Sequence, residues 1–181
     1  THIEGLPVEI IANFIDKGTL DTHTATVNWG DGTPTESGTV LEQPFGPPGS
    51  DVGNNGLVIG SHEYADNGKF TVEICISDDD TTVCREERIQ VRDASPVVDA
   101  GPDVTLNEGV FMTLAPAAFS DSGFDSDTIP SEETFTASID WGDGTTEPDA
   151  DIALLYSTGS AGTPSIGTIQ AFHAYGEYGV Y

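Results

Sequence analysis

The sequence predicts an all-β protein built from two tandem β-sandwich modules, and three observations lead to this prediction. The tetrapeptide Trp-Gly-Asp-Gly occurs twice, at residues 29–32 and 141–144. Apolar residues alternate with polar residues in short runs, as they do in half-buried β-strands. The 181 residues include 21 glycines and 11 prolines, which indicates many turns. The repeat assigns residues 1–93 to one module and residues 94–181 to the other, and each approaches the roughly 100 residues of an immunoglobulin-type sandwich.

Other landmarks recur around the two tetrapeptides in the same order, which extends the duplication to nearly the whole chain. In the first module they are Phe14–Asp16, His62–Tyr64 and Gly68–Phe70, and we pair these with Phe119–Asp121, His173–Tyr175 and Gly176–Tyr178 in the second. No cluster of reactive side chains is duplicated with them. A repeated frame of this kind is typical of an array of structural modules rather than of an enzyme.

Runs with a period of two give the expected strands. In the first run, Val8, Ile10 and Phe14 alternate with polar residues such as Glu9 and Asn13. The first module is expected to contain strands at Val8–Phe14, Thr24–Trp29, Gly38–Glu42, Leu57–Ile59, Lys69–Ser77 and Thr82–Val91. The second is expected to contain strands at Val104–Leu106, Val110–Leu114, Phe135–Trp141, Ile152–Tyr156 and Ile166–Phe172, and the beginning of one at Glu177–Tyr181.

Two cysteines flank an acidic tetrapeptide in the first module. If residues 78–81 form a hairpin loop, Cys75 lies directly opposite Cys84, at the separation that a disulfide requires. The alternation of the strand places this pair on its outer face. A metal site is disfavoured, because two thiolates without a nearby histidine or further cysteine cannot complete a tetrahedron. Two free cysteines remain the alternative, whereas a disulfide would indicate an oxidising compartment.

The chain is strongly acidic, with a formal net charge of −26. Such a charge repels phosphate backbones and anionic lipid surfaces, so nucleic acid is not expected as a partner. Two interpretations of the acidity remain open: a solvated surface, or divalent-cation binding by some of the carboxylates. No run reaches the ~18 apolar residues that span a membrane, so direct membrane insertion is not expected. Because the chain lacks an initiator methionine and stops at Tyr181 inside an expected strand, we expect a fragment of a larger polypeptide.

The residues of the repeated tetrapeptide are expected to be structural. Trp29 and Trp141 end strands on the inward side and would fill the sandwich centres. Asp31 and Asp143 would bond their own backbone in turns flanked by glycine. A catalytic role for these aspartates is weakly supported, because no second carboxylate or histidine recurs beside them.

The His-x-Tyr pairs are also expected to be structural. Tyr64 and Tyr175 are similar to the tyrosine of a tyrosine corner, whose hydroxyl ties a loop to the backbone. His62 and His173 are expected to be packed and hydrogen-bonded, because a single histidine per module without a nucleophile cannot form a catalytic dyad.

Taken together, these motifs resemble the PKD domain, the polycystic kidney disease repeat. The resemblance rests on Trp-Gly-Asp-Gly-Thr, on His-x-Tyr-x-x-x-Gly-x-aromatic and on the acidic turn after residues 72–77. It implies two immunoglobulin-like sandwiches, the first without its opening strand and the second without its closing strands. Members of this family act mostly as spacers and interaction modules in stalks, in surface layers or in secreted hydrolases.

The resemblance also implies a calcium site, because some PKD domains bind Ca²⁺ between the loop after the first long strand and a late acidic turn. Calcium takes six to eight oxygen ligands, which clustered carboxylates supply. A hydrated acidic turn is the alternative. The matching residues are Asp16, Asp21, Asp78, Asp79 and Asp80 in the first module and Asp121, Asp125 and Asp127 in the second, where the partner turn would fall beyond Tyr181.

The expected function is therefore that of a non-enzymatic, extracellular structural or adhesive repeat of a large cell-surface, filament-forming or layer-forming protein. The alternative is an accessory carbohydrate- or protein-binding module of a secreted hydrolase, which an exposed row of Trp or Tyr would favour. The expected partners are neighbouring repeats, with self-assembly or another surface protein or glycan as further options. The open sheet edge expected in the second module would be covered by continuation of the chain or by a strand from another chain, and we favour continuation.

Overall fold

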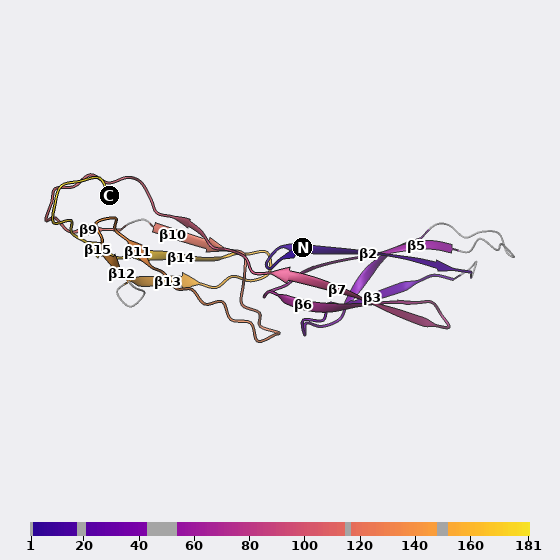
Figure 1. The fold of residues 1–181 in the computed structure, drawn as a ribbon. Coiled ribbons are helices and arrows are strands. Elements are labelled where there is room, and N and C mark those ends of the chain that lie inside the picture. Colours follow the sequence, from indigo (N-terminus) through magenta and orange to yellow (C-terminus); the bar gives the residue numbers. More distant parts are fainter. Residues whose placement is uncertain (1, 18–20, 43–53, 115–116, 148–151) are drawn as a thin grey trace. The chain divides into compact units, whose positions relative to one another are not determined.

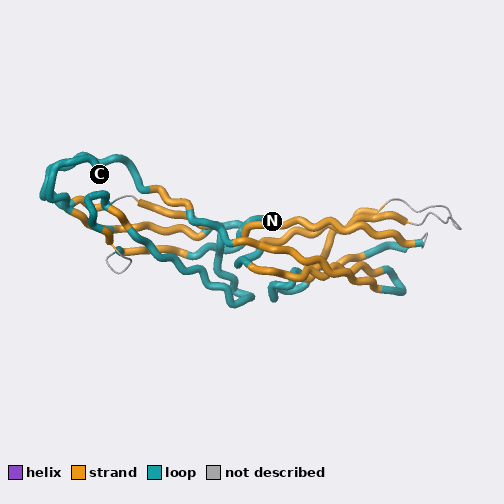
Figure 2. The backbone as a smooth tube through the Cα atoms, viewed as in Figure 1, coloured by secondary structure: helices purple, strands orange, loops and turns teal. Residues whose placement is uncertain are grey.

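The computed structural model describes residues 2–17, 21–42, 54–114, 117–147 and 152–181, and this part of the chain contains β-strands and no helix (Figures 1 and 2). The prediction of an all-β chain is therefore confirmed. No helix of the described residues is long and apolar enough to cross a membrane. The chain divides into two compact units, which are described separately below: unit 1 is residues 1–93 with 127–130, and unit 2 is residues 94–126 with 131–181.

Unit 1 is built from the long strands of the first module. Their hydrogen bonds join them into one sheet with the order β1-β7-β6-β3-β4-β5-β2. The strands are β1 (His2–Ile3), β2 (Pro7–Asp16), β3 (Thr24–Asn28), β4 (Glu36–Glu42), β5 (Asn54–Glu63), β6 (Gly68–Ser77) and β7 (Thr82–Arg92). Each predicted strand of this module is present, and most extend by one to several residues beyond the predicted run.

The sheet of unit 1 changes layer along β4 and so encloses a core. Residues 36–38 of β4 pair with β3, whereas residues 39–42 pair with β5. At this change Gly38 lies against the core, where an added Cβ would come within 2.8 Å of the Val58 side chain. The buried side chains come from both layers and form one cluster, consisting of Val8, Ile10, Ala25, Val27, Trp29, Val58, Tyr64, Val72, Ile74 and Val91.

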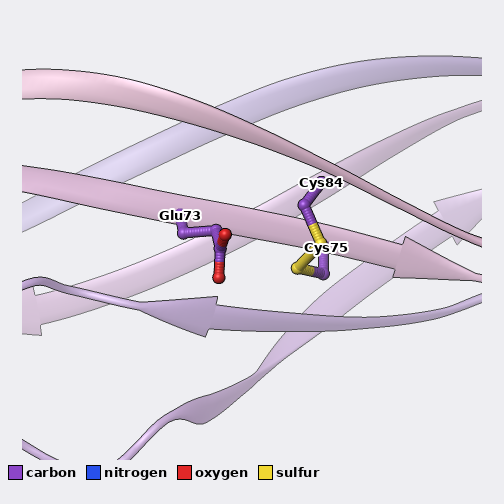
Figure 3. A group of neighbouring side chains, drawn as sticks. All are labelled: Glu73, Cys75 and Cys84. Carbon is purple, nitrogen blue, oxygen red and sulfur yellow. A yellow bond between two sulfur atoms is a disulfide. The ribbon is translucent and has the colours of Figure 1, made fainter.

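A disulfide joins Cys75 of β6 to Cys84 of β7, which confirms the predicted pair (Figure 3). The register places the two residues directly opposite each other, with their Cα atoms 4.0 Å apart. On the same face, Ser77 and Thr82 share a hydroxyl hydrogen bond of 2.8 Å. The residues on either side of Cys75 in β6 face the core instead: Ile74 is buried in it and Ile76 packs against it. The bridge therefore staples the outer face of the hairpin.

Unit 2 has shorter strands, which form three separate sheets in the described residues. The largest has the order β13-β14-β10-β8, and the other two are the pairs β11-β12 and β15-β9. The strands are β8 (Val97–Asp99), β9 (Met112–Thr113), β10 (Ala117–Asp121), β11 (Ile139–Asp140), β12 (Thr146–Glu147), β13 (Ala153–Ser157), β14 (Ser165–Gln170) and β15 (Phe172–His173). Trp141, Ile152 and Ala171 form its buried cluster.

Several strand predictions for the second module were wrong. No strand forms at 104–106 or at 177–181, and only the two-residue strands β9 and β11 form within 110–114 and 135–141. Conversely, β8 and β10 were not predicted, although they pair with each other. Alternating polarity marks a segment that can form a strand, but the strand itself exists only where a partner pairs with it.

Candidate functional site

In unit 1 the Trp-Gly-Asp-Gly segment forms a tight corner at the end of β3. The Asn28 side-chain oxygen accepts a hydrogen bond of 3.0 Å from the backbone N–H of Gly30. One oxygen of Asp31 accepts the backbone N–H of Thr33 at 3.0 Å and its hydroxyl at 2.6 Å. Gly30 has φ = +78°, and a Cβ there would collide with the Thr71 carbonyl oxygen. The chain can turn this closely against β6 only with glycine at residue 30.

His62 and Tyr64 close the corner from the end of β5. The Nε2 atom of His62 lies 2.7 Å from the second carboxylate oxygen of Asp31, and its ring stacks on Trp29 with the centroids 4.9 Å apart. The Tyr64 hydroxyl donates a 3.0 Å hydrogen bond to the Trp29 carbonyl. This is the bond to backbone that the tyrosine-corner interpretation predicts.

Glu36 completes the corner, and sequence reasoning did not find it. One carboxylate oxygen accepts the indole N–H of Trp29 at 3.0 Å, and the other lies 3.5 Å from Nδ1 of His62. The signal that could have found it is its place in the strand that follows the corner, opposite Val27. In the second module the strand register places Glu147 opposite Ile139, as it places Glu36 opposite Val27.

Burial and hydrogen bonding act on Asp31 in opposite directions. Burial alone would raise the pKa of this carboxyl, but the hydrogen bonds from His62 and Thr33 outweigh it and hold the pKa at about 2. Asp31 is therefore ionised throughout the neutral range. The pKa of Tyr64 is raised well above its usual value, by burial and then by the negative charge of Asp31, so its hydroxyl remains a donor.

Unit 2 contains the same corner with nearly the same dimensions. Asp143 accepts the backbone N–H and hydroxyl of Thr145 at 3.0 and 2.6 Å, and lies 2.8 Å from Nε2 of His173. Hydrogen bonds from Thr145 and then from His173 hold the pKa of Asp143 at about 2. The His173 ring stacks on Trp141 at 4.7 Å, and the Tyr175 hydroxyl donates to the Trp141 carbonyl at 3.1 Å.

The two corners differ at the indole nitrogen. The Nε1 atom of Trp141 is buried and has no hydrogen-bond partner among the described residues. The corresponding atom of Trp29 donates to Glu36. An unpaired buried donor costs about 1–3 kcal/mol, so among the described residues the second corner has the weaker set of bonds.

The geometry corrects the pairing of the Gly-x-aromatic segments. Phe70 stacks on Tyr64 with the ring centroids 4.4 Å apart, and it is Tyr181, not Tyr178, that stacks on Tyr175 at the same distance. Tyr178 is 90% exposed. Gly68–Phe70 therefore corresponds to Gly179–Tyr181, and the pairing with Gly176–Tyr178 was wrong. The His-x-Tyr-x-x-x-Gly-x-aromatic spacing itself agrees with the corrected pairing.

At the opposite end of the strands in unit 1, three of the side chains that can bind a metal approach one another. Asp16 ends β2, His23 precedes β3, and Asp78 begins the turn between β6 and β7; one ligand atom from each lies within 4.8 Å of those of the other two. The His23 side chain is only 4% exposed, and its Nδ1 lies 3.0 Å from a carboxylate oxygen of Glu42. Sequence reasoning placed Asp16 and Asp78 here but did not include His23 or its hydrogen-bond partner Glu42.

The three other predicted ligands of this module are Asp21, Asp79 and Asp80. The pKa of Asp21 is raised by burial and then by the negative charges of Asp79, Asp16 and Asp78. The pKa of Asp78 is lowered by the backbone N–H groups of Thr81 and Asp80, which donate to its Oδ1. Asp79 and Asp80 are exposed. The turn thus stabilises the ionised carboxylate of Asp78, and further carboxylates of the same charge lie near it.

The predicted ligands of the second module do not form such a group. Asp121 is buried and accepts the backbone N–H of Gly123 at 2.8 Å, and Asp125 accepts that of Glu133 at 2.7 Å. Asp127 is exposed. Within the described residues, none of the three belongs to a cluster of three or more side chains that could hold a metal.

Glu73 lies beside the disulfide on the outer face of the hairpin (Figure 3). Together with Cys75 and Cys84, it forms another group of side chains whose potential metal-ligand atoms lie close together. Since both sulfurs are in the disulfide, they are not thiolate ligands, and this cluster is not a metal site.

In comparisons with protein-family models, with curated proteins and with solved structures, no family, protein or structure matches this chain.

Proposed function

We propose that this chain is a pair of PKD-like, immunoglobulin-like sandwiches that serve as a non-enzymatic structural or adhesive repeat at the outside of a cell. The observation that carries the proposal is the duplicated corner. In each unit, the carboxylate, the histidine and the tyrosine hydroxyl bond to the corner's own turn and tryptophan. Residues that are engaged in this way hold a scaffold together, whereas a catalytic group must present a free atom to a substrate.

The disulfide supports the extracellular part of the proposal, because such bonds persist in oxidising compartments. The proposal is tested on the source cells with an antibody raised against the purified chain. Labelling of intact cells, removed by brief external protease treatment, is the expected result. Labelling that requires permeabilised cells would contradict the extracellular location.

The accessory-module alternative receives no support from the tryptophans. Trp29 is fully buried and Trp141 is 5% exposed, so neither is available to stack on a sugar. We therefore propose that the chain adheres to neighbouring repeats or to other surface proteins.

We also propose that unit 1 binds Ca²⁺ through Asp16, Asp21, Asp78 and Asp79. The donor chemistry fits, because several carboxylates from separate segments supply the hard oxygen ligands that calcium takes. Burial and then the neighbouring carboxylates raise the pKa of Asp21, and a bound cation would relieve the repulsion between these carboxylates. The cation would cross-link the end of β2 to the turn between β6 and β7.

The calcium proposal is tested by melting the protein in Ca²⁺ and in NaCl of matched ionic strength. At a hundredfold excess over Kd, binding to the folded form adds about 2.7 kcal/mol, which raises the Tm by several degrees. The double variant Asp78→Asn, Asp79→Asn should lose this rise. The matched control Glu86→Gln, Glu87→Gln changes charge equally at exposed positions of the same hairpin and should keep it. An equal rise in NaCl would show that only general screening is at work.

A further inference from the structure

His23 presents one of its ring nitrogens to the carboxylates at the end of unit 1. The side chain is only 4% exposed, and no described residue hydrogen-bonds to its Nε2 atom, which lies 3.8 Å from Oδ2 of Asp16. This separation is too long for a hydrogen bond. Two ligands that one cation holds at about 2.1 Å lie roughly 3–4 Å apart. The two atoms are therefore placed as ligands of one cation rather than as a hydrogen-bonded pair.

Glu42 fixes the orientation of this ring. Its carboxylate accepts the backbone N–H of His23 at 2.9 Å and lies 3.0 Å from Nδ1, and the Phe14 ring packs on the imidazole with the centroids 4.7 Å apart. Because an ionised carboxylate only accepts, Nδ1 carries the proton, and in the neutral ring the lone pair is then on Nε2. Histidines that bind metals commonly donate their other ring N–H to a carboxylate in this way.

The strand register brings a third ligand to the same place. Thr24 of β3 lies opposite Ser77 of β6, so the next residues outward, His23 and Asp78, meet at this end of the two strands. The backbone N–H of Asp80 donates to Oδ1 of Asp78 and holds that carboxylate in its turn. One ligand atom of Asp78 lies within 4.8 Å of those of His23 and Asp16. Three separate segments thus supply one nitrogen and two carboxylates.

We propose that Asp16, His23 and Asp78 bind a divalent transition-metal ion of the zinc type, with Nε2 of His23 as the nitrogen ligand. The inference rests on the cation site proposed above and adds a second class of cation to it. Calcium takes oxygen ligands, whereas Zn²⁺ binds imidazole nitrogen and carboxylate oxygen together, and three protein ligands suffice when water supplies the fourth. The two ions would share Asp16 and Asp78 and therefore compete.

Calorimetric titration of the 181-residue protein with Zn²⁺, after treatment with a chelator, tests this proposal. One Zn²⁺ should bind per chain at a site that His23→Gln abolishes, because glutamine has no imidazole nitrogen. The matched control His2→Gln removes a histidine of the same unit outside the group and should leave this binding unchanged. Glu42→Gln should weaken it about 10–100-fold, as is usual when a carboxylate that orients a metal-binding histidine is lost.

Two further measurements separate the zinc site from the calcium site and from a simple ion pair. His23→Gln should keep the rise in Tm that Ca²⁺ causes, because every carboxylate remains in place. Nitrogen NMR of the imidazole rings should show that Zn²⁺ shifts the Nε2 signal of His23 while Nδ1 keeps its proton. If His23→Gln does not fold, Asp16→Asn, at a side chain that is 31% exposed, replaces it and should also lose Zn²⁺ binding.

Unchanged Zn²⁺ binding in His23→Gln or in Asp16→Asn would overturn the proposal. So would an Nε2 atom that stays protonated when Zn²⁺ is present, which would identify His23 as a cationic partner of the carboxylates instead. Failure of Zn²⁺ to bind while Ca²⁺ still raises the Tm would overturn this inference alone. Binding of Zn²⁺ through His23 without any specific effect of Ca²⁺ would overturn the calcium proposal and support this one.

Discussion

Trp29 and Trp141 hold the same position in two copies of one hydrogen-bonded corner, but their surroundings differ. Trp29 is fully buried, its indole N–H donates to Glu36, and strands pair on both sides of β3. Trp141 has an unpartnered indole nitrogen in the described structure and follows β11, which has two residues and one pairing strand there. The corner therefore keeps its geometry even where the sheet around it is reduced, because its turn, histidine, tyrosine and tryptophan bond directly to one another and do not require long strands.

The largest expected effect is the loss of either tryptophan. Trp29→Ala should cost unit 1 about 3–5 kcal/mol, since it removes a fully buried aromatic side chain and leaves Glu36 without its indole donor. Trp141→Ala should cost unit 2 less, because no hydrogen bond to the indole is present among the described residues. Hydrogen exchange of each unit under increasing denaturant measures the two costs, and the fluorescence of the remaining tryptophan reports on the unaltered unit as a control. Equal costs would contradict the difference between the corners.

Reduction of the disulfide should affect unit 1 alone. The bridge closes a loop with a sequence separation of 9, for which the chain-entropy estimate is about 2–3 kcal/mol. The Cys75→Ser, Cys84→Ser variant should lose a similar amount in unit 1, as measured by denaturant unfolding in the absence of reductant. A comparable loss in unit 2 would show that the two units do not unfold independently.

The aspartates of the two corners should give a pH dependence with the same sign. The pKa of Asp31 in the folded protein is about 2, below the ~3.9 of an unfolded aspartate, so its ionised form stabilises unit 1 above pH ~4. This contribution, about 2 kcal/mol, should disappear as the pH falls from about 4 to about 2.

The variants Asp31→Asn and Asp143→Asn check this pH dependence. Asp31→Asn should flatten the acid limb of the unit 1 stability curve. Asp143→Asn should change the unit 2 curve in the same direction but less, because the Asp143 residue is exposed. The measurement is denaturant unfolding at pH 2, 3, 4 and 6. An unchanged acid limb in Asp31→Asn would show that the hydrogen bonds from His62 and Thr33 do not lower the pKa of this carboxyl.

The smallest expected effect concerns the tyrosine hydroxyls. Tyr64→Phe removes a buried hydrogen bond to the Trp29 carbonyl and should cost about 1 kcal/mol. Tyr175→Phe should cost less, since Tyr175 is only half-buried and water can replace its hydroxyl. Thermal unfolding with enthalpies from calorimetry resolves a difference of this size. A larger cost for Tyr175→Phe would reverse the expected ranking of the corners.

Features that depend on neighbouring residues could be predicted from the sequence. The four-residue loop placed Cys75 opposite Cys84, and the Asp-Gly-Thr segments indicated turns in which the aspartate bonds its own backbone. The strands of unit 1 were predictable for the same reason, because each long alternating run finds partners on the sheet.

Features that depend on distant pairing could not be predicted. The run 135–141 alternates as well as the run 24–29, but only two of its residues form a strand. The alternation of polarity does not reveal which partner strand is present, so the difference between the two runs could not be predicted. His23 and Glu42 lie 19 residues apart, and only the fold brings them together beside Asp16 and Asp78. The correspondence of Tyr181 to Phe70 could have been predicted, because only Gly179–Tyr181 has the motif spacing after Tyr175, and the stacking of Tyr181 on Tyr175 agrees with it.

Native-state hydrogen exchange of β3 and β11 tests most directly the claim that the two units share one corner but differ in the strand beside it. Both Val27 and Asn28 should be strongly protected, because β3 is paired on both sides. Of Ile139 and Asp140, the residue whose N–H points away from β12 should exchange close to the unprotected rate, while the Trp141 N–H, bonded to the Thr145 carbonyl at 3.3 Å, stays protected. Equal protection of both β11 residues and both β3 residues in the isolated chain would contradict this claim.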